Sequence, residues 1–257
     1  MQARIVETAR GARWLAEGWR LFRVAPLGWL AAVFGYWLLM TLVSLVPFIG
    51  VPAAALLVPA FSVGFMALAR AAGHQARLDL ALLFDGFRHE PRAQIALGVV
   101  YLACLAALLG ASALVDGGAL ARWMLSGERP PDEVLDSADF MSAAAAAAAL
   151  YLPVMLAFWF APPLASWHGS GAAKALFFSF AAAMMNWRAF LAYGAVMALV
   201  TVLVPFALAW LLALASGGAS TLPPTMLAFP LVIVLLPTVF ASFYASYRDV
   251  FGYDAAP

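Results

Sequence analysis

The sequence predicts an all-α membrane protein with six transmembrane helices, arranged as three tandem parallel-repeat hairpins that each follow an amphipathic cytoplasmic helix. Three observations predict this class: long stretches carry no charge, parts of the chain repeat, and positive charge gathers on one side of the predicted spans. Of the 257 residues, 66% are hydrophobic and only 11% are charged. An average globular domain has about 25% charged residues.

The charge-free stretches predict the spans. Residues 27–69, 93–115, 140–173 and 189–247 contain no Asp, Glu, Lys or Arg. A helix needs about 20 consecutive apolar residues to cross the hydrocarbon core of a bilayer. The predicted spans are 27–46, 51–69, 94–115, 143–165, 189–215 and 223–245. Together with the segments between them, they predict a single integral membrane domain over 1–257.

The connections contain residues that end helices. Two prolines and a glycine in 47–52 separate the first two spans, and the glycine- and serine-containing segment 216–222 closes the last hairpin. Residues 1–26 form an amphipathic lead before the first span. Residues 116–141 are predicted to form an acidic loop. Apart from Asp116, its acids lie in 128–139: Glu128, Asp132, Glu133, Asp136 and Asp139.

Lys and Arg residues predict the orientation, because cytoplasmic connections of membrane proteins are enriched in positive charge. Twelve of the fourteen fall on one side of the predicted spans. These are Arg4, Arg10, Arg13, Arg20, Arg23, Arg70, Arg77, Arg88, Arg92, Lys174, Arg188 and Arg248. The other side has Arg122 and Arg129. We therefore expect a multi-pass protein of the bacterial inner membrane, with both termini cytoplasmic and the acidic loop periplasmic.

An internal repeat relates the first and last hairpins. A shift of 158 residues places Leu45-Val46-Pro47-Phe48 on Leu203-Val204-Pro205-Phe206. A shift of 178 residues places Pro52, Pro59 and Arg70 on Pro230, Pro237 and Arg248. Because both copies keep the same orientation, the repeat is parallel rather than inverted. The middle hairpin fits more weakly, through the Leu-Phe pairs that precede each hairpin.

The segment before each hairpin predicts a short cytoplasmic helix. At about 100° per residue, Trp14, Leu15, Trp19 and Phe22 share one face. The other face has Arg10, Arg13, Glu17, Arg20 and Arg23. Helices of this kind lie in the membrane interface, so the predicted interfacial anchors are Trp14, Trp19, Phe22, Phe84 and Phe87. An amphipathic helix packed on the inner ends of the spans explains the same pattern, and the sequence leaves both alternatives open.

Six segments spread along the chain carry a resemblance to a known family. They are Trp19-Arg20-Leu21-Phe22 with Pro26 and Trp29, Ser62-Val63-Gly64-Phe65-Met66, Leu83-Phe84-x-Gly86-Phe87-Arg88, Phe160-Ala161-Pro162-Pro163, Lys174-Ala175-Leu176-Phe177-Phe178-Ser179-Phe180 and Asn186-Trp187-Arg188. With these segments the chain resembles an uncharacterised family of Gram-negative bacterial inner-membrane proteins. The repeated unit is also distantly similar to the membrane domain that accompanies some glycerophosphodiester phosphodiesterases. The resemblance implies fold and location, and it implies no activity.

The sequence offers little chemistry. The predicted spans carry no ionisable Asp, Glu, Lys or Arg, which disfavours ion-coupled transport through a buried acid. Asp116, at the outer end of the third span, fits a capping role. His74, His89 and His168 lack metal-ligand spacing. We expect no enzyme, no catalytic or metal site and no cofactor, and the near-neutral charge of +1 argues against a nucleic-acid partner.

Two residue sets remain as candidate sites. Pro59, Pro163 and Pro237 fall in the second helix of the three hairpins, where they predict kinks that line a cavity or that simply belong to the repeat's packing. Arg70, Arg92, Arg188 and Arg248 mark the cytoplasmic ends of spans, and they predict lipid-headgroup binding or ordinary topological anchoring.

We therefore expect a non-enzymatic membrane-organising or accessory protein that binds membrane lipids or another membrane protein. The alternative is an uncoupled transporter or channel for an apolar or amphiphilic solute. Tight packing between the hairpins favours the first function, and a hydrated or lipid-filled cavity favours the second.

Overall fold

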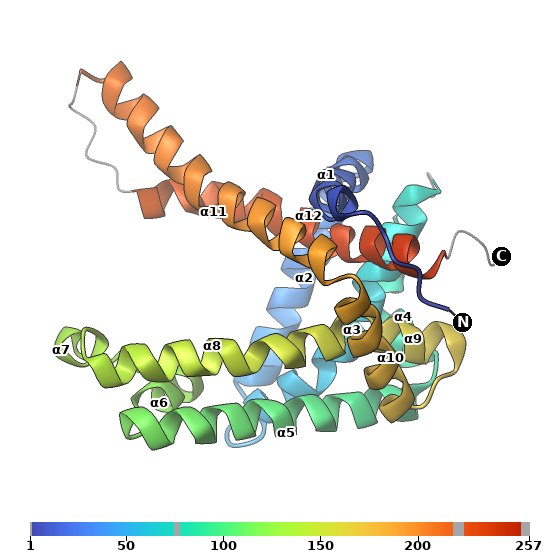
Figure 1. Ribbon diagram of the computed structural model, residues 1–257, viewed down its shortest axis with the longest axis horizontal. Coiled ribbons are helices and arrows are strands. Elements are labelled where there is room, and N and C mark those ends of the chain that lie inside the picture. Colours follow the sequence, from blue (N-terminus) through green and yellow to red (C-terminus); the bar gives the residue numbers. More distant parts are fainter. Residues whose placement is uncertain (1, 75–77, 218–223, 253–257) are drawn as a thin grey trace. The chain divides into compact units, whose positions relative to one another are not determined.

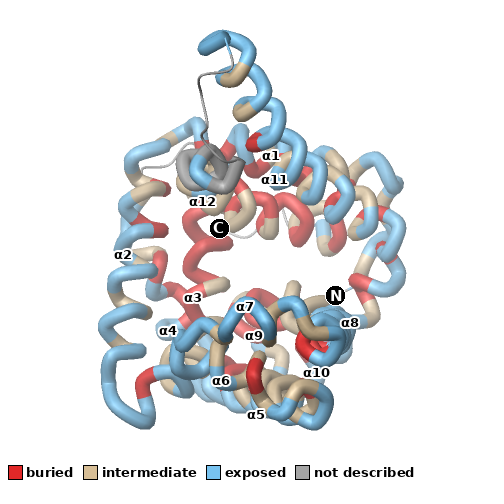
Figure 2. Tube along the Cα trace, turned by 90° about the vertical axis from the view of Figure 1, so that its left-hand side faces the viewer, coloured by how far each residue is buried: buried red, intermediate tan, exposed pale blue. Residues whose placement is uncertain are grey.

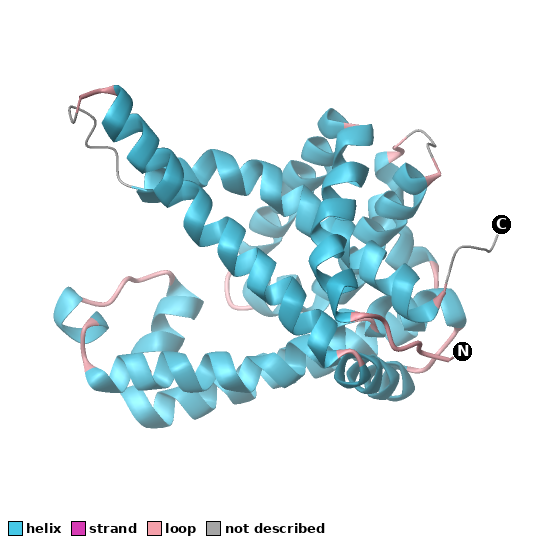
Figure 3. Cartoon of the chain, turned by 45° about the horizontal axis from the view of Figure 1, so that its top comes forward, coloured by secondary structure: helices cyan, strands magenta, loops and turns pink. Residues whose placement is uncertain are grey.

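Every element in the described part of the chain is a helix (Figure 3). The computed structural model describes residues 2–74, 78–217 and 224–252 (Figure 1). Six of its helices are long and apolar enough to cross a membrane: Pro26–Ser44, Gly50–Gly73, Pro91–Asp116, Ala138–His168, Trp187–Ala215 and Leu231–Phe251. The number of spans matches the prediction. The ends of the first five spans differ from the predicted ends by up to five residues, whereas the last span is Leu231–Phe251 in place of the predicted 223–245.

The elements have the following bounds: α1 Thr8–Val24, α2 Pro26–Ser44, α3 Gly50–Gly73, η1 Leu80–Phe84, α4 Asp85–Arg88, α5 Pro91–Asp116, α6 Ala119–Ser126, α7 Asp132–Leu135, α8 Ala138–Trp159, α9 Ala161–His168, α10 Ala172–Met185, α11 Trp187–Ala215 and α12 Pro224–Phe251. The fourth span therefore comprises two helices, α8 and α9. The last span extends past its predicted end at 245 and includes Arg248 and Asp249.

The chain divides into two compact units, each made of separate segments. Unit 1 comprises residues 1–37, 64–83 and 182–257, and unit 2 comprises 38–63 and 84–181. Neither unit is a continuous stretch of sequence, and α2, α3 and α10 each contribute to both. The single membrane domain over 1–257 stays a prediction.

Unit 1 is built around α1, α11 and α12. Helix α1 packs on both of the others, and α11 lies beside α12 (Figure 1). An aromatic cluster adds to this core: the rings of Phe65 and Phe240 stack with centroids 4.1 Å apart, and Tyr36 meets Phe65 edge-on at 5.3 Å. More than half of the residues in the C-terminal half of α12 are buried (Figure 2), Ala241 and Tyr247 among them.

Unit 2 is built around the antiparallel pair α5 and α8 (Figure 1). Both helices are dominated by small and aliphatic residues, and Ala143, Ala147 and Leu97 are buried there. Small side chains let helix backbones approach closely, which is the usual basis of helix packing in lipid. At Gly98, a Cβ atom would stand 3.0 Å from the Leu56 carbonyl carbon and closer still to its oxygen, so α5 also lies tightly against α3 within this unit.

The predicted acidic loop contains two short helices, α6 and α7. The Asp116 carboxylate accepts hydrogen bonds from the backbone N–H groups of Gly118 at 2.9 Å and Leu120 at 2.7 Å. These donors belong to the start of α6, where backbone N–H groups lack helical partners. Asp116 therefore has the capping role that the sequence predicted.

Some predicted features lie outside the described residues. Among them are Arg77, residues 218–222 of the last predicted turn, and residue 223, the predicted start of the last span. The turn between α2 and α3 is described, and there Phe48 has a φ of +66°.

Candidate functional site

Helix α1 is docked in unit 1 by a stripe of small and apolar residues. Its buried residues are Gly11, Trp14, Leu15, Gly18, Leu21 and Phe22, which recur at the three- and four-residue spacing of one helix face. A Cβ atom at Gly11 would stand 2.6 Å from the Ala189 carbonyl carbon of α11, and one at Gly18 would stand 2.9 Å from Ser242 Cβ of α12. The two glycines thus let α1 lie directly on the backbones of both helices.

A network of four charged side chains joins α1 to the end of α12. Arg10 pairs with Asp249 at 2.5 Å and with Glu17 at 2.9 Å, while Arg248 pairs with Glu17. The Trp14 indole N–H donates to Asp249 Oδ2 at 2.9 Å. The two positive and two negative charges balance, so the network is complete without a ligand.

The network also sets the protonation of Arg10. Burial by itself lowers the pKa of the Arg10 guanidinium, but the hydrogen bond and charge of Asp249, followed by those of Glu17, outweigh it. The pKa of Arg10 therefore lies above its ordinary value, and this side chain stays charged at every physiological pH.

Asn186 fastens the N-terminal segment to unit 1. This buried side chain accepts from Val6 N at 2.8 Å and donates from Nδ2 to the carbonyl oxygens of Arg4 at 3.0 Å and Ala182 at 2.9 Å. Arg4 N also donates to the Val250 carbonyl oxygen at 2.7 Å. Asn186 and the end of α12 therefore hold the backbone of residues 4–6 in place.

Two exposed tryptophans in unit 1 carry an arginine beside them. Arg23 lies over the Trp19 ring at 5.8 Å, and Arg188 lies over the Trp187 ring at 5.4 Å. Trp19 is 41% exposed and Trp187 is 49% exposed. Each pair lies near the end of a helix, close to a predicted span boundary. Tryptophan is enriched at the membrane–water interface, and arginine is enriched near the cytoplasmic ends of spans.

In unit 2, polar side chains cluster around the start of α5 and the end of α9. Gln94 Nε2 donates to the Pro162 carbonyl oxygen and to Ser166 Oγ, both at 2.9 Å, and Ser166 Oγ donates to the His89 carbonyl oxygen at 3.2 Å. Asp85 is also buried, with Trp167 Nε1 at 3.4 Å from its carboxylate. Among the described residues, Gln94 Oε1 has no hydrogen-bond partner.

Ser179 of α10 is inserted into the backbone hydrogen bonds of α8. Its hydroxyl accepts from Phe160 N and donates to the Leu156 carbonyl oxygen, both at 2.9 Å. In a continuous helix that N–H would bond directly to that carbonyl, four residues earlier. The side chain thus stabilises the break between α8 and α9, which is followed by Pro162 and Pro163.

The predicted kink prolines are buried. Pro59 and Pro237 lie inside α3 and α12, whereas Pro163 lies at the start of α9, where a new helix begins. Gly86 of α4 packs against the carbonyl group of Ala60, the residue that follows Pro59. In the same way, Gly18 of α1 packs against the carbonyl group of Thr238, the residue that follows Pro237.

The four candidate lipid-binding arginines have different surroundings. Arg248 is only 23% exposed and is engaged with Glu17 and Asp249. Arg70 is half-buried, while Arg92 and Arg188 are exposed. Arg92 and Arg188 are therefore the two whose guanidinium groups are open to a headgroup.

The five predicted interfacial anchors also divide. Trp14 and Phe22 are buried in the protein, at 0% and 5% exposure, whereas Trp19, Phe84 and Phe87 remain exposed by 36% or more. Packing on neighbouring helices, the alternative left open by the sequence, therefore describes Trp14 and Phe22.

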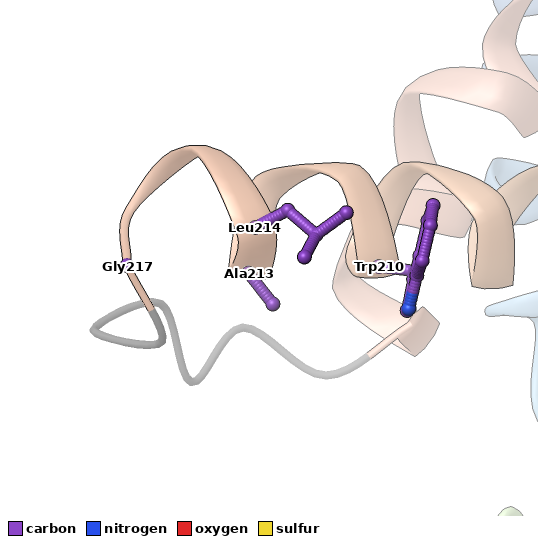
Figure 4. A pocket seen from close by; sticks show the side chains of 4 residues that line it. All are labelled: Trp210, Ala213, Leu214 and Gly217. Atoms are coloured by element: carbon purple, nitrogen blue, oxygen red, sulfur yellow. The ribbon is translucent and has the colours of Figure 1, made fainter.

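Neither of the two best-formed surface pockets among the described residues contains a predicted site residue. One of about 260 Å³ is lined by Trp210, Ala213, Leu214 and Gly217 at the end of α11 (Figure 4). The other, of about 200 Å³, lies in the acidic loop, where residues between Ala119 and Val134 line it. Within the described ranges, no three His, Cys, Asp or Glu side chains form a group that could hold a metal ion.

Sequence reasoning missed Asn186, Ser179 and the acids Glu17 and Asp249. Asn186 stands in the Asn-Trp-Arg segment and Ser179 in the Lys174–Phe180 segment that carried the family resemblance, but neither has a local pattern that reveals its partners. Glu17 and Arg248 are 231 residues apart, and no periodicity relates them.

Comparison with known proteins identifies a close relative. A probable inner membrane protein of Burkholderia thailandensis is 40% identical over 258 aligned residues, which cover 98% of this chain and 94% of the relative. No family model matches the chain, so the distant similarity to the membrane domain of glycerophosphodiester phosphodiesterases stays a prediction. No solved structure matches it either.

Proposed function

We propose that this chain, which belongs to the family of the probable inner membrane protein of Burkholderia thailandensis, organises the membrane in which it resides. The chain is a multi-pass inner-membrane protein with six apolar helices. Its proposed role is non-enzymatic: it binds membrane lipid or another membrane protein, with no cofactor and no nucleic-acid partner.

The observation that carries this proposal is the pairing of exposed tryptophan with arginine in unit 1. Trp19 with Arg23 and Trp187 with Arg188 place an amphipathic ring and a fixed positive charge side by side. The ring favours the interfacial layer, and each basic residue near the surface attracts anionic lipid by about 1 kcal/mol. A protein with both termini cytoplasmic presents these pairs to the anionic cytoplasmic leaflet.

The repeat belongs to the same proposal. The shift of 178 residues that aligns Pro59 with Pro237 also aligns Ala60 with Thr238. In unit 2 the carbonyl group of Ala60 meets Gly86, and in unit 1 the carbonyl group of Thr238 meets Gly18. Equivalent positions of the first and last hairpins are thus each contacted by a glycine of a short helix. This equivalence supports the proposed arrangement of three tandem units.

The packing of each unit favours organisation over transport. Pro59, Pro163 and Pro237 are buried. The residues that follow Pro59 and Pro237 are each in contact, through their carbonyl groups, with a glycine of another helix. A transport pathway along these prolines would have to displace those contacts. The transporter or channel alternative stays a prediction without a structural observation in its favour.

The test is native mass spectrometry of the protein gently extracted from its own membrane. We expect retained phospholipid, and we expect Trp19→Ala combined with Trp187→Ala to reduce the retained fraction at least threefold. Trp210→Ala is the matched control, because Trp210 is 65% exposed on α11 and its neighbours in sequence, Ala209 and Leu211, carry no charge.

Three outcomes are decisive. A retained protein subunit in place of lipid would assign the organising role to a protein partner. A bare wild-type protein would contradict the proposal and would make flux assays in liposomes the next experiment. Equal losses in the double variant and in Trp210→Ala would show that the arginine-paired tryptophans have no special part.

A further inference from the structure

Helix α10 is too short to cross a membrane. Its 14 residues, Ala172–Met185, extend about 21 Å at 1.5 Å per residue, whereas the hydrocarbon core is about 30 Å thick. It is nevertheless almost wholly apolar, and Lys174 is its one charged residue. An apolar helix of this length needs either a protein cover or an interfacial position.

One face of α10 is fixed by the protein. Ala175 and Ser179 are both completely buried, and the Ser179 hydroxyl bridges Phe160 and Leu156 of α8. These contacts lie within unit 2. They hold the rotation of α10 about its axis, and so determine which side chains face away from the protein.

The opposite face presents aromatic rings. Phe177 is 69% exposed, Phe178 is 40% exposed and Phe180 is 39% exposed. The rings of Phe177 and Phe178 pack edge-to-face at 5.7 Å, and Lys174 Nζ lies 5.9 Å from the Phe178 ring. Three exposed phenylalanines form an apolar aromatic face of the kind that interfacial helices bury in the headgroup boundary, although α10 as a whole is more apolar than most such helices and carries a single lysine.

We propose that α10 lies in the plane of the cytoplasmic membrane surface, with Phe177, Phe178 and Phe180 sunk into the headgroup boundary and Lys174 bound to an anionic phospholipid headgroup. The proposal deepens the membrane-organising function and rests on its topology. Charge complementarity favours lipid as the occupant: the surface carries one positive charge and no negative charge, and the cytoplasmic leaflet is anionic.

The first experiment measures the depth of α10 in the full-length protein reconstituted in liposomes. In a Cys104→Ser background, a nitroxide is attached at Phe177→Cys, and its accessibility to oxygen and to a water-soluble nickel complex gives its depth. Leu203→Cys, exposed in the middle of α11, marks the hydrocarbon core, and Glu133→Cys in the outer loop marks water. We expect the label at residue 177 to fall between these two, near the headgroups.

Any other depth of the label at residue 177 would overturn the proposal. A label at residue 177 as accessible to nickel as the one at residue 133 would place α10 in water. A label as deep as the one at residue 203 would place it within the core. Protection from both reagents would show that protein covers the aromatic face. Depth is read without any retained lipid, so this result is independent of the mass-spectrometric test of the proposed function.

The second experiment tests the headgroup. In nanodiscs that contain phosphatidylglycerol and phosphatidylethanolamine, Lys174→Glu should lower the enrichment of phosphatidylglycerol on the protein at least threefold. Arg129→Glu in the outer loop, whose side chain is 64% exposed, should leave it unchanged. Unaltered enrichment in Lys174→Glu, or an equal loss in both variants, would contradict headgroup binding at Lys174.

Discussion

Gly18 of α1 lies against the carbonyl group of Thr238 in α12, so closely that a Cβ atom at residue 18 would overlap it. This contact brings together two residues 220 positions apart in the sequence. It makes the docking of α1 depend on the absence of a single methyl group.

Gly18→Ala should therefore destabilise unit 1. Forcing an extra carbon into a packed contact costs about 1–3 kcal/mol, although alanine is the better helix former by about 1 kcal/mol. Gly35→Ala is the matched control, because nothing lies within 4 Å of a Cβ atom there, and it should be neutral or stabilising. Unfolding in mixed detergent micelles measures both, and equal effects would contradict the close contact.

Asn186 should be as sensitive as Gly18, because one amide serves three backbone groups. Asn186→Asp keeps the acceptor for Val6 N but loses the donor to the carbonyl oxygens of Arg4 and Ala182. A buried group that loses its partner costs about 1–3 kcal/mol. We expect faster amide hydrogen exchange at Val6 and cleavage of the N-terminal segment by protease. Unchanged protection would mean that the Arg4–Val250 bond alone holds the segment.

Ser179→Ala should loosen the junction of α8 and α9. It would leave Phe160 N and the Leu156 carbonyl oxygen without the hydroxyl that now joins them, at a cost of about 1–3 kcal/mol. Ser179→Thr keeps the hydroxyl and should restore most of the stability. Ser142→Ala, which removes only an exposed bond to Asp139 within α8, serves as the control in thermal unfolding. A loss in that control equal to the loss in Ser179→Ala would argue against the bridge.

The spans could be predicted because lipid imposes a simple demand on them. A spanning helix must be apolar over about 20 residues, so the six runs are visible without any knowledge of their neighbours. The break at Phe160 was not predictable in the same way, since the Ser179 hydroxyl that stabilises it comes from another helix. The expected kink at Pro163 is instead the first turn of α9.

The site residues were harder to predict because an apolar face looks the same toward lipid and toward protein. Trp14 and Trp19 share one predicted face of α1, yet Trp14 is fully buried beside Phe190 and Trp19 is exposed. Arg248 illustrates the same limit for charge. Its position at the end of a span predicts a headgroup contact, but Glu17 reaches it from the other end of the chain.

The Arg10 network predicts an unusual lack of pH dependence. The pKa of Arg10 is higher in the folded protein than in the unfolded chain. The stabilisation by the charged side chain is therefore fully present at any pH below the pKa of the unfolded chain, and it is lost only as the pH rises through the pKa of the folded protein. The ordinary pKa of an arginine already lies far above pH 9 and the folded-state pKa of Arg10 is higher still, so the stability difference between wild type and Arg10→Met should be constant from pH 7 to pH 9. We expect about 1–2 kcal/mol, which allows for the 29% exposure of the side chain. A difference that shrinks toward pH 9 would contradict this assignment.

The orientation of the chain rests on positive charge alone, and it can be tested directly. A reporter fused after Ala138 should be periplasmic and one fused after Ala76 should be cytoplasmic, because the predicted topology places twelve of the fourteen Lys and Arg residues on the same side as residue 76. Only Arg122 and Arg129 stand on the opposite side in the predicted topology, so few charges oppose this orientation. Adding two arginines near residue 124 should weaken the bias, whereas adding two aspartates should not, since acidic residues contribute little to orientation. If the reporter after Ala138 is cytoplasmic, the surface proposed for α10 faces the other leaflet, and the inferred lipid contact fails with it.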